Sequence, residues 1–299
     1  MKISNLILSN DSHTGMRILV LSGIAWLPLV VLTLIEGTFI SDAITIPFVM
    51  DVVPYVRGLV IIPLLVLADN VIEPMMARIV GYLRTSGVAP ESERERLDTA
   101  VNRMTYLINV KWIQLTIVML ALLVSWLLRT DYADMWKEEG VTSWALHLVD
   151  GDVDETLAGL WFLFVTSPLV TFLFYRWIWR YIAWIIFLYR VSRLKLELYA
   201  SHTDLAGGVG ILGGAQSLFA IVFLVMATMI SSQLANNLLY EGENLLDEKL
   251  VVVVFIIISV VLIEAPLLFF TSKLFKLKRI ALAEYGALQH QISRDFHHH

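Results

Sequence analysis

The sequence predicts an all-α polytopic membrane protein, a bundle of about six transmembrane helices. Of its 299 residues, 58% are hydrophobic and only 16% are charged, and the mean hydropathy is +0.72. An ordinary soluble domain is much less apolar than this. Long apolar runs recur along the chain, and the charges between them are segregated by sign. We therefore expect the chain to fold in a lipid bilayer.

Six apolar runs are long enough to cross the hydrocarbon core of a membrane, which takes about 20 helical residues. They lie at residues 18–40, 56–77, 110–128, 157–175, 211–234 and 250–272. The first run is too long for the apolar region of a signal peptide, so we interpret it as a retained span. Without internal repeats or linkers, residues 1–296 are expected to form a single transmembrane domain. Residues 297–299 are histidines, interpreted as the remnant of an expression tag.

Basic residues gather at alternate ends of the predicted spans. Lysines and arginines cluster within residues 78–103, 176–195 and 273–279, whereas the loops at 131–155 and 241–248 are mainly acidic. Lysine and arginine accumulate on the cytoplasmic side of membrane proteins. This distribution predicts that both the N and C termini are cytoplasmic.

The third and fourth helices are predicted to extend into the cytoplasm, near residues 84–109 and 176–204. After Pro90, no glycine or proline interrupts the sequence before the third span, so a single bent or straight helix is expected. In the second extension, Arg193 and Glu197 have the spacing of a helical ion pair, which would stabilise the exposed end.

Three acidic residues inside the spans are candidates for an ion path. Asp69 and Glu73 share a face of the second helix, and Glu264 falls at a similar depth in the sixth. Pro74 and Pro266 follow the two glutamates and can free backbone carbonyls for cations, water or neighbouring side chains. If the acids converge, they would suit the passage of a cation or a proton.

The alternative is that these acids are structural. Charges inside spans are costly and are normally paired. Arg176, Arg180 and Arg78 are available near the same ends of the helices, and such pairs would fix the helices without transporting anything. At the opposite end of the first span, Glu36 is expected at the interface, with Arg57 as a possible partner.

The segment at 176–198 alternates aromatic and basic residues. Amphipathic rings and arginines meet lipid head groups at membrane interfaces. We therefore interpret Arg176, Arg180, Trp177 and Trp184 as interface anchors rather than as a stacking platform for nucleic acid or a cofactor. An anionic-lipid site formed by the two arginines is a further possibility.

Residues 200–216, ASHTDLAGGVGILGGAQ, raise three alternatives. His202 and Asp204 form either a catalytic acid/base pair, part of an ion-coupling hinge, or a structural turn in which Asp204 caps the next helix. Gly207, Gly208 and Gly210 would give that hinge its conformational freedom. The glycine spacing matches neither a phosphate-binding loop nor a dinucleotide-binding fingerprint.

No metal site or cofactor is predicted. The chain has no cysteine, and outside the terminal tag it has only four histidines. The acidic run DGDVDE at 150–155 resembles the start of a calcium loop, but glutamate replaces the required glycine and tryptophan replaces the final glutamate.

The C-terminal half resembles a family of uncharacterised bacterial integral membrane proteins whose hallmark is H-P-D-x-A-G-G. The match runs from RWIWRYIAWIIFLYRVSRLKLELYASHTDLAGG through LLYEG, APLLFF and EYGAL. His202, Asp204, Ala206, Gly207 and Gly208 fit the hallmark, whereas Thr203 replaces its proline and removes a rigid bend. The resemblance implies a bacterial inner-membrane location and no particular activity.

The function that these features favour is an ion channel or transporter, for cations, assembled as a homo-oligomer. Asp69, Glu73 and Glu264 would line the path, and the turn around His202 and Asp204 would couple it to the cytoplasmic helices. The alternatives are a membrane-embedded enzyme that uses His202 and Asp204, and a non-catalytic scaffold or sensor. Lipid is the expected environment, and no nucleic-acid partner is expected.

Overall fold

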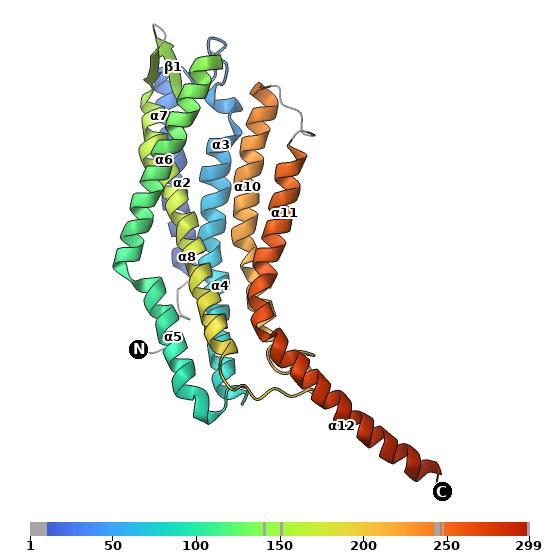
Figure 1. The fold of residues 1–299 in the computed structure, drawn as a ribbon. Coiled ribbons are helices and arrows are strands. Elements are labelled where there is room, and N and C mark those ends of the chain that lie inside the picture. Colours follow the sequence, from blue (N-terminus) through green and yellow to red (C-terminus); the bar gives the residue numbers. More distant parts are fainter. Residues whose placement is uncertain (1–10, 140–141, 150–151, 242–245, 247, 298–299) are drawn as a thin grey trace.

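The computed structural model describes residues 11–139, 142–149, 152–241, 246 and 248–297. Most of the described chain is helical, and the long helices run alongside one another (Figure 1). Six helical stretches among these residues are long and apolar enough to cross a membrane, and each overlaps a predicted run. They are Thr14–Glu36, Val52–Thr85, Lys111–Arg129, Leu157–Ser192, Ile211–Tyr240 and Lys249–Ala287. The all-α prediction is confirmed, and the six apolar helices support the predicted multi-pass membrane protein.

The first two stretches are α2 (Asp11–Glu36) and a composite helix. In the composite, the short α3 (Val52–Tyr55) continues through a π-helical segment, η2 (Val56–Ile61), into α4 (Ile62–Thr85). Pro74 lies inside α4, where a proline removes one backbone donor. The side chain of Asp51 accepts a hydrogen bond from the Val53 amide and so caps α3.

The third span is bent sharply away from the helix that precedes it. A 3-10 turn, η3 (Glu91–Glu93), leads into α5 (Arg94–Asn109), and α6 (Lys111–Glu139) follows after a single residue. That residue, Val110, has an extended backbone with ψ of 122°. The helix is therefore interrupted rather than continuous. The side-chain amide of Gln114 donates to the carbonyl of Ile108 at 3.1 Å, which satisfies a group freed by the break.

The fourth span consists of α7 (Leu157–Trp161), a second π segment, η4 (Phe162–Thr166), and α8 (Ser167–Ser192). The helix ends at Ser192, so the predicted helical extension to residue 204 is wrong beyond that point. The expected pair between Arg193 and Glu197 is replaced by other contacts. Arg193 donates to the Tyr189 hydroxyl, while the Glu197 amide donates to the carbonyl of Val88 and ties this segment to another connection.

The last two spans lie beside one another (Figure 1), and the fifth packs closely against the second span, whereas α11 of the sixth makes its main contacts outside its own span with the fifth. The fifth contains α9 (Ile211–Leu218), α10 (Ala220–Asn236) and a third π segment, η5 (Asn237–Glu241). The sixth begins with α11 (Lys249–Glu264) and passes through a 3-10 segment, η6 (Ala265–Phe270).

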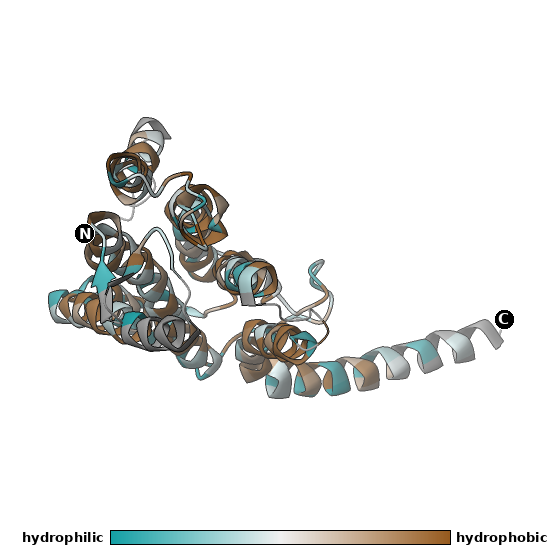
Figure 2. Ribbon diagram, turned by 90° about the horizontal axis from the view of Figure 1, so that it is seen from above, coloured by the Kyte–Doolittle hydropathy of each residue, from teal (hydrophilic) through white to brown (hydrophobic). Residues whose placement is uncertain are grey.

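The C-terminal helix, α12 (Thr271–His297), projects away from the bundle. Seen from above, the bundle helices are mostly hydrophobic, whereas the projecting helix alternates polar and apolar residues (Figure 2). Apolar residues also face outward on α11, where Val251, Ile257 and Val261 are each about half exposed. Lipid or protein must cover such a surface in a membrane.

A small β-hairpin, which the sequence did not predict, marks one end of the bundle. Strand β1 (Leu146–Val149) pairs with β2 (Asp152–Glu155) in antiparallel register. A 3-10 turn, η1 (Phe48–Met50), belongs to the connection that pairs with residues just before β1. We call the end of the bundle that carries this hairpin the hairpin end. At the opposite, loop end lie residues 193–210 and the start of α12 (Figure 1).

The main hydrophobic core lies between α4, α8 and the fifth span. Its largest buried side chains include Trp177, Trp184 and Phe187 of α8 and Phe219 beside α10. Trp184 stacks on both phenylalanine rings. Trp177 and Trp184 are therefore core residues, which corrects their interpretation as lipid anchors. The alternation of aromatic and basic residues does not by itself distinguish core residues from lipid anchors, because the turn of a helix also directs some of its aromatic side chains toward the protein interior.

Candidate functional site

Asp69 is the centre of a charged cluster that joins three spans. Its side chain on α4 is only 7% exposed. Arg17 of α2 lies 3.0 Å from one carboxylate oxygen, and Arg180 of α8 lies 2.7 Å from the other. Arg176, one helical turn before Arg180, also reaches Asp69 at 3.3 Å. We call these residues, with Glu73, the Asp69 network.

Glu73 completes the Asp69 network one turn further along α4. Its carboxylate lies 2.6 Å from an Arg180 guanidinium nitrogen, and the Arg180 guanidinium also stacks over the Trp177 ring, 4.8 Å from its centroid. The network therefore holds three arginines against two carboxylates. Asp69 and Glu73 are thus paired with Arg176 and Arg180, as one alternative expected, and the two arginines point toward carboxylates rather than lipid.

Other sequence candidates lie outside this network. The side chains of Glu264 on α11 and of Arg78 are both exposed. Glu36, at the hairpin end, accepts a hydrogen bond of 2.6 Å from the Leu157 amide and caps the start of α7. A carboxylate favours this position because the N-terminus of a helix presents free amides and a partial positive charge.

The kink at Pro266 creates a second buried polar cluster. Proline cannot bond to the carbonyl four residues before it, which is that of Leu262. The Tyr181 hydroxyl donates to this carbonyl. The Gln216 amide donates to the next carbonyl, Ile263, at 2.6 Å, and its oxygen accepts from Trp184. Neighbouring side chains thus satisfy the freed carbonyls, one of the outcomes expected from the sequence.

The turn at 200–210 is organised by Asp204. One carboxylate oxygen accepts hydrogen bonds from the amides of Ala206 and Gly208, both at 3.0 Å, and the other accepts from Gly210 at 2.7 Å. His202 Nδ1 lies 2.8 Å from the same carboxylate, and its Nε2 lies 3.4 Å from the Tyr82 hydroxyl. Since both oxygens of Asp204 bind backbone amides, the geometry supports a structural turn over an acid/base pair.

The charge of Asp204 is strongly stabilised. Burial alone would raise the pKa of Asp204, but three backbone amides and His202 outweigh burial and lower the pKa to about 2. Hydrogen bonds to the ionised carboxylate favour the charged form. The turn is therefore expected to hold its shape throughout the physiological pH range.

Protonation of Asp204 at acidic pH should weaken the hydrogen bonds that hold this turn. A carboxylate whose pKa is lowered in the folded state stabilises that state above its ordinary pKa, 3.8, and loses the contribution as pH falls toward about 2. We expect hydrogen-exchange protection of the amides of Ala206, Gly208 and Gly210 to fall across this window. In Asp204→Asn, protection should be weaker and should lack the acid step. The same acid step in the variant would contradict this role.

Two glycines in the turn have conformations that other residues rarely adopt. Gly207 has φ of 66° and Gly208 has φ of 98°. A Cβ at Gly208 would also lie 2.8 Å from a Val88 methyl carbon, so the turn packs directly against another connection. The positive φ angles are consistent with the predicted need for glycine's conformational freedom at Gly207 and Gly208.

Gly208→Ala should therefore destabilise the chain by roughly 1 to 3 kcal/mol, through backbone strain and the clash with Val88. Thermal unfolding in nanodiscs would measure the loss. Gly213→Ala is the matched control, because Gly213 lies in α9 and the nearest atom to its added Cβ is 4.0 Å away. Equal stability of the two variants would contradict the argument.

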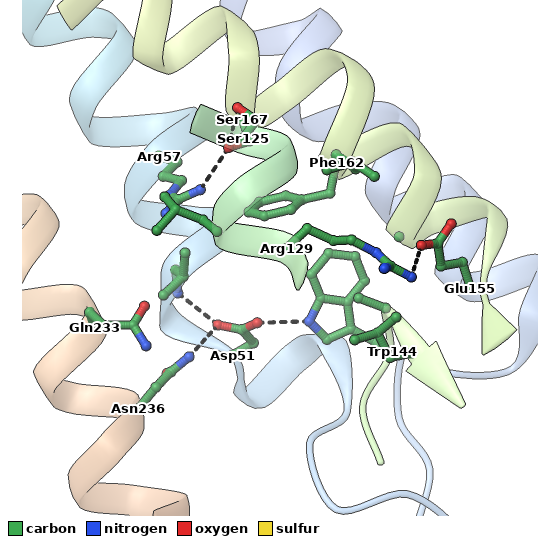
Figure 3. A pocket seen from close by; sticks show the side chains of 16 residues that line it. Asp51, Arg57, Ser125, Arg129, Trp144, Glu155, Phe162, Ser167, Gln233 and Asn236 are labelled. Carbon is green, nitrogen blue, oxygen red and sulfur yellow. Dashed lines mark hydrogen bonds and ion pairs between the residues drawn. The ribbon is translucent and has the colours of Figure 1, made fainter. Parts of the chain in front are cut away.

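A pocket of about 130 Å³ lies near the hairpin end (Figure 3). Asp51 is its most buried acid, and it accepts hydrogen bonds of 2.8 Å from both Trp144 Nε1 and Asn236 Nδ2. Arg129 of α6 pairs with Glu155 of β2 across the same pocket. Arg57 donates to Ser167 Oγ at 3.3 Å. We call this the hairpin pocket.

Three π-helical segments border the hairpin pocket. Arg57 lies in η2, Phe162 lies in η4, and Asn236 directly precedes η5. Single π turns are uncommon inside α-helices and are frequent at functional sites. The sequence interpretation missed this pocket, because its polar residues are far apart in sequence and belong to no recognised motif. Arg57, a charge inside a predicted span, was the available signal.

Comparisons with protein families, curated proteins and solved structures found no match to this chain. Its chemistry must therefore be argued from the residues themselves. Among the residues that the structure describes, no three histidine, aspartate or glutamate side chains are grouped to hold a metal ion.

Proposed function

We propose that this chain is a transport protein of the bacterial inner membrane that moves small charged solutes or ions. Its loop end and both termini would face the cytoplasm, as the basic residues favour. The resemblance to bacterial membrane proteins supports the same location. In this assignment the hairpin pocket opens toward the outside and the Asp69 network lies toward the cytoplasm.

The observation that carries this proposal is the placement of two polar sites along the same two helices. Arg57 and Asp69 are 12 residues apart, which corresponds to roughly 18 Å along a helix. On the fourth span, Ser167 belongs to the hairpin pocket and Arg176 to the Asp69 network. Membrane proteins retain costly intramembrane charges mainly where they serve a pathway.

The layer between the two polar sites is apolar and buried. It includes Ile61, Ile62 and Leu65 of the second span and Val170 and Leu173 of the fourth, each less than 10% exposed. A solute bound in the hairpin pocket cannot pass this layer without movement of the helices. The arrangement fits a transporter in a closed conformation better than an open channel.

The Asp69 network acts as the inner gate in this proposal. Its ion pairs join α2, α4 and α8, so that breaking them would allow these helices to separate. A cation passing Asp69 or Glu73 would have to compete with arginines already bound there. The acidic outer loops favour cations as cargo, but the network itself supports gating better than cation binding.

A homo-oligomer is part of the proposal. Glu264 exposes a carboxylate on α11, a helix whose exposed surface is mostly apolar. A carboxylate that faces lipid is costly, so contact with protein or water is favoured. A second copy of the chain against α11 would provide that contact.

Flux measurements in proteoliposomes test this function. The purified chain is expected to move a monovalent cation, a small carboxylate or an amino acid faster than protein-free liposomes. Arg57→Gln should reduce the flux, whereas Arg103→Gln, an exposed arginine on α5, should not. A folded native chain that moves none of these solutes would contradict the proposal.

A further inference from the structure

We propose that the hairpin pocket binds a small zwitterion, an α-amino acid about the size of alanine. The claim that this ligand is the cargo of a transporter rests on the proposed function. Its binding to the pocket is a separate property that can be measured without transport. The inference depends on the volume of the pocket, its balanced charges and the separate positions of its donors and acceptors (Figure 3).

The volume suits a ligand of a few heavy atoms. The pocket measures about 130 Å³. A protein cavity of about 150 Å³ holds benzene, which has six heavy atoms, as alanine does. Much of the wall is apolar and includes Leu128, Leu146 and Leu163. The rings of Trp144 and Phe162 meet edge to face, with centroids 5.6 Å apart. These walls suit a short aliphatic group.

The charges lining the pocket sum to zero. Asp51 and Glu155 contribute two carboxylates, and Arg57 and Arg129 contribute two guanidinium groups. Adding a net charge to a partly buried, balanced site leaves one charge without compensation, which is costly. A zwitterion brings one charge of each sign and keeps the balance. The pocket therefore favours a zwitterion over a simple anion or cation.

Arg129 and Arg57 provide the donors for the carboxylate of the ligand. The Nε atom of Arg129 is buried and has no hydrogen-bond partner among the described residues, although another nitrogen of the same group binds Glu155. Arg57 lies over the Phe162 ring, 5.2 Å from its centroid. Guanidinium groups form strong, charge-assisted hydrogen bonds with carboxylates.

Asp51 provides the acceptor for an ammonium group. Its Oδ1 accepts from the Val53 amide at 2.9 Å and from Asn236, while its Oδ2 accepts from Trp144. A carboxylate oxygen has two acceptor sites, so Oδ2 retains one for an ammonium proton. The neighbouring aromatic rings add favourable contacts with a cation. Asp51 and Arg129 thus recognise opposite ends of one ligand.

Calorimetry with alanine and two analogues that each lack one of its charged groups tests the inference. Alanine carries both charges, isobutyrate replaces the ammonium group with methyl, and isopropylamine replaces the carboxylate with methyl. Native protein in nanodiscs should bind alanine, and bind either analogue at least about a hundredfold more weakly, because each leaves a buried partner unpaired. Binding of isobutyrate as tight as that of alanine, or no binding of alanine, would overturn the inference.

Substitutions in the pocket test which residue binds the carboxylate and which binds the ammonium group of the ligand. Arg129→Gln and Asp51→Asn should each weaken alanine binding by at least about tenfold, while Arg103→Gln leaves it unchanged. Unfolding temperatures identify any variant that fails to fold, and Glu155→Gln provides a second variant on the Arg129 side. Unchanged alanine binding in a folded Arg129→Gln protein would contradict the assignment. Alanine binding without flux would instead contradict the transport function alone.

Discussion

Replacing Asp69 with asparagine is expected to destabilise the folded chain by roughly 3 to 5 kcal/mol, the usual cost of leaving buried charges uncompensated. Asparagine keeps the size of the side chain and removes its charge. Glu73, which pairs with Arg180, would then be the one carboxylate left in the network, and Arg17 and Arg176 would lose their ion pairs with Asp69. Thermal unfolding in nanodiscs measures the loss.

A second substitution separates charge balance from packing. In Asp69→Asn/Arg176→Gln, one positive charge is also removed, and we expect a large part of the lost stability to return. Glu264→Gln is the matched control, since this acid lies in a span but outside the Asp69 network. If Asp69→Asn is no less stable than Glu264→Gln, the arginines do not depend on Asp69.

Trp184→Ala should cost roughly 3 to 5 kcal/mol, the range for removing a large buried aromatic side chain. Trp184 is fully buried, stacks on Phe187 and Phe219, and donates to Gln216. Its loss leaves a cavity and an amide oxygen without its donor. Chemical or thermal unfolding of the purified protein measures the effect.

The comparison that decides the role of Trp184 is with an exposed tryptophan. Trp112 on α6 is 76% exposed, and Trp112→Ala should change stability much less. Trp184→Phe should be intermediate, because it keeps an aromatic ring and loses the donor. A small effect at both positions would contradict the contribution of Trp184 to the stability of the core.

The number and approximate positions of the spans followed from the sequence because a membrane imposes a minimum length of apolar helix. The ends of the helices could not be predicted from the sequence in the same way. The α8 helix ends at Ser192 because groups distant in sequence bind the residues after it, including Val88 and Lys273. Likewise, the break at Val110 has no glycine or proline to signal it.

The candidate sites were only partly predictable. The spacing of Asp69 and Glu73 predicted a shared helix face, and Arg176 and Arg180 were correctly named as alternative partners. The contribution of Arg17 depends on how α2 packs against α4, which spacing within one helix does not reveal. The hairpin pocket depends on five separate segments and on a hairpin that the sequence did not predict.

Thiol labelling of Leu65→Cys tests the gate most directly, since the native chain contains no cysteine. Leu65 is 1% exposed and lies one helical turn before Asp69, on the side toward the hairpin pocket. A membrane-impermeant thiol reagent applied at the loop end should leave this cysteine unmodified in the otherwise native protein. It should modify the cysteine once Asp69→Asn opens the network. A folded Asp69→Asn protein in which the cysteine stays unmodified would contradict the gate.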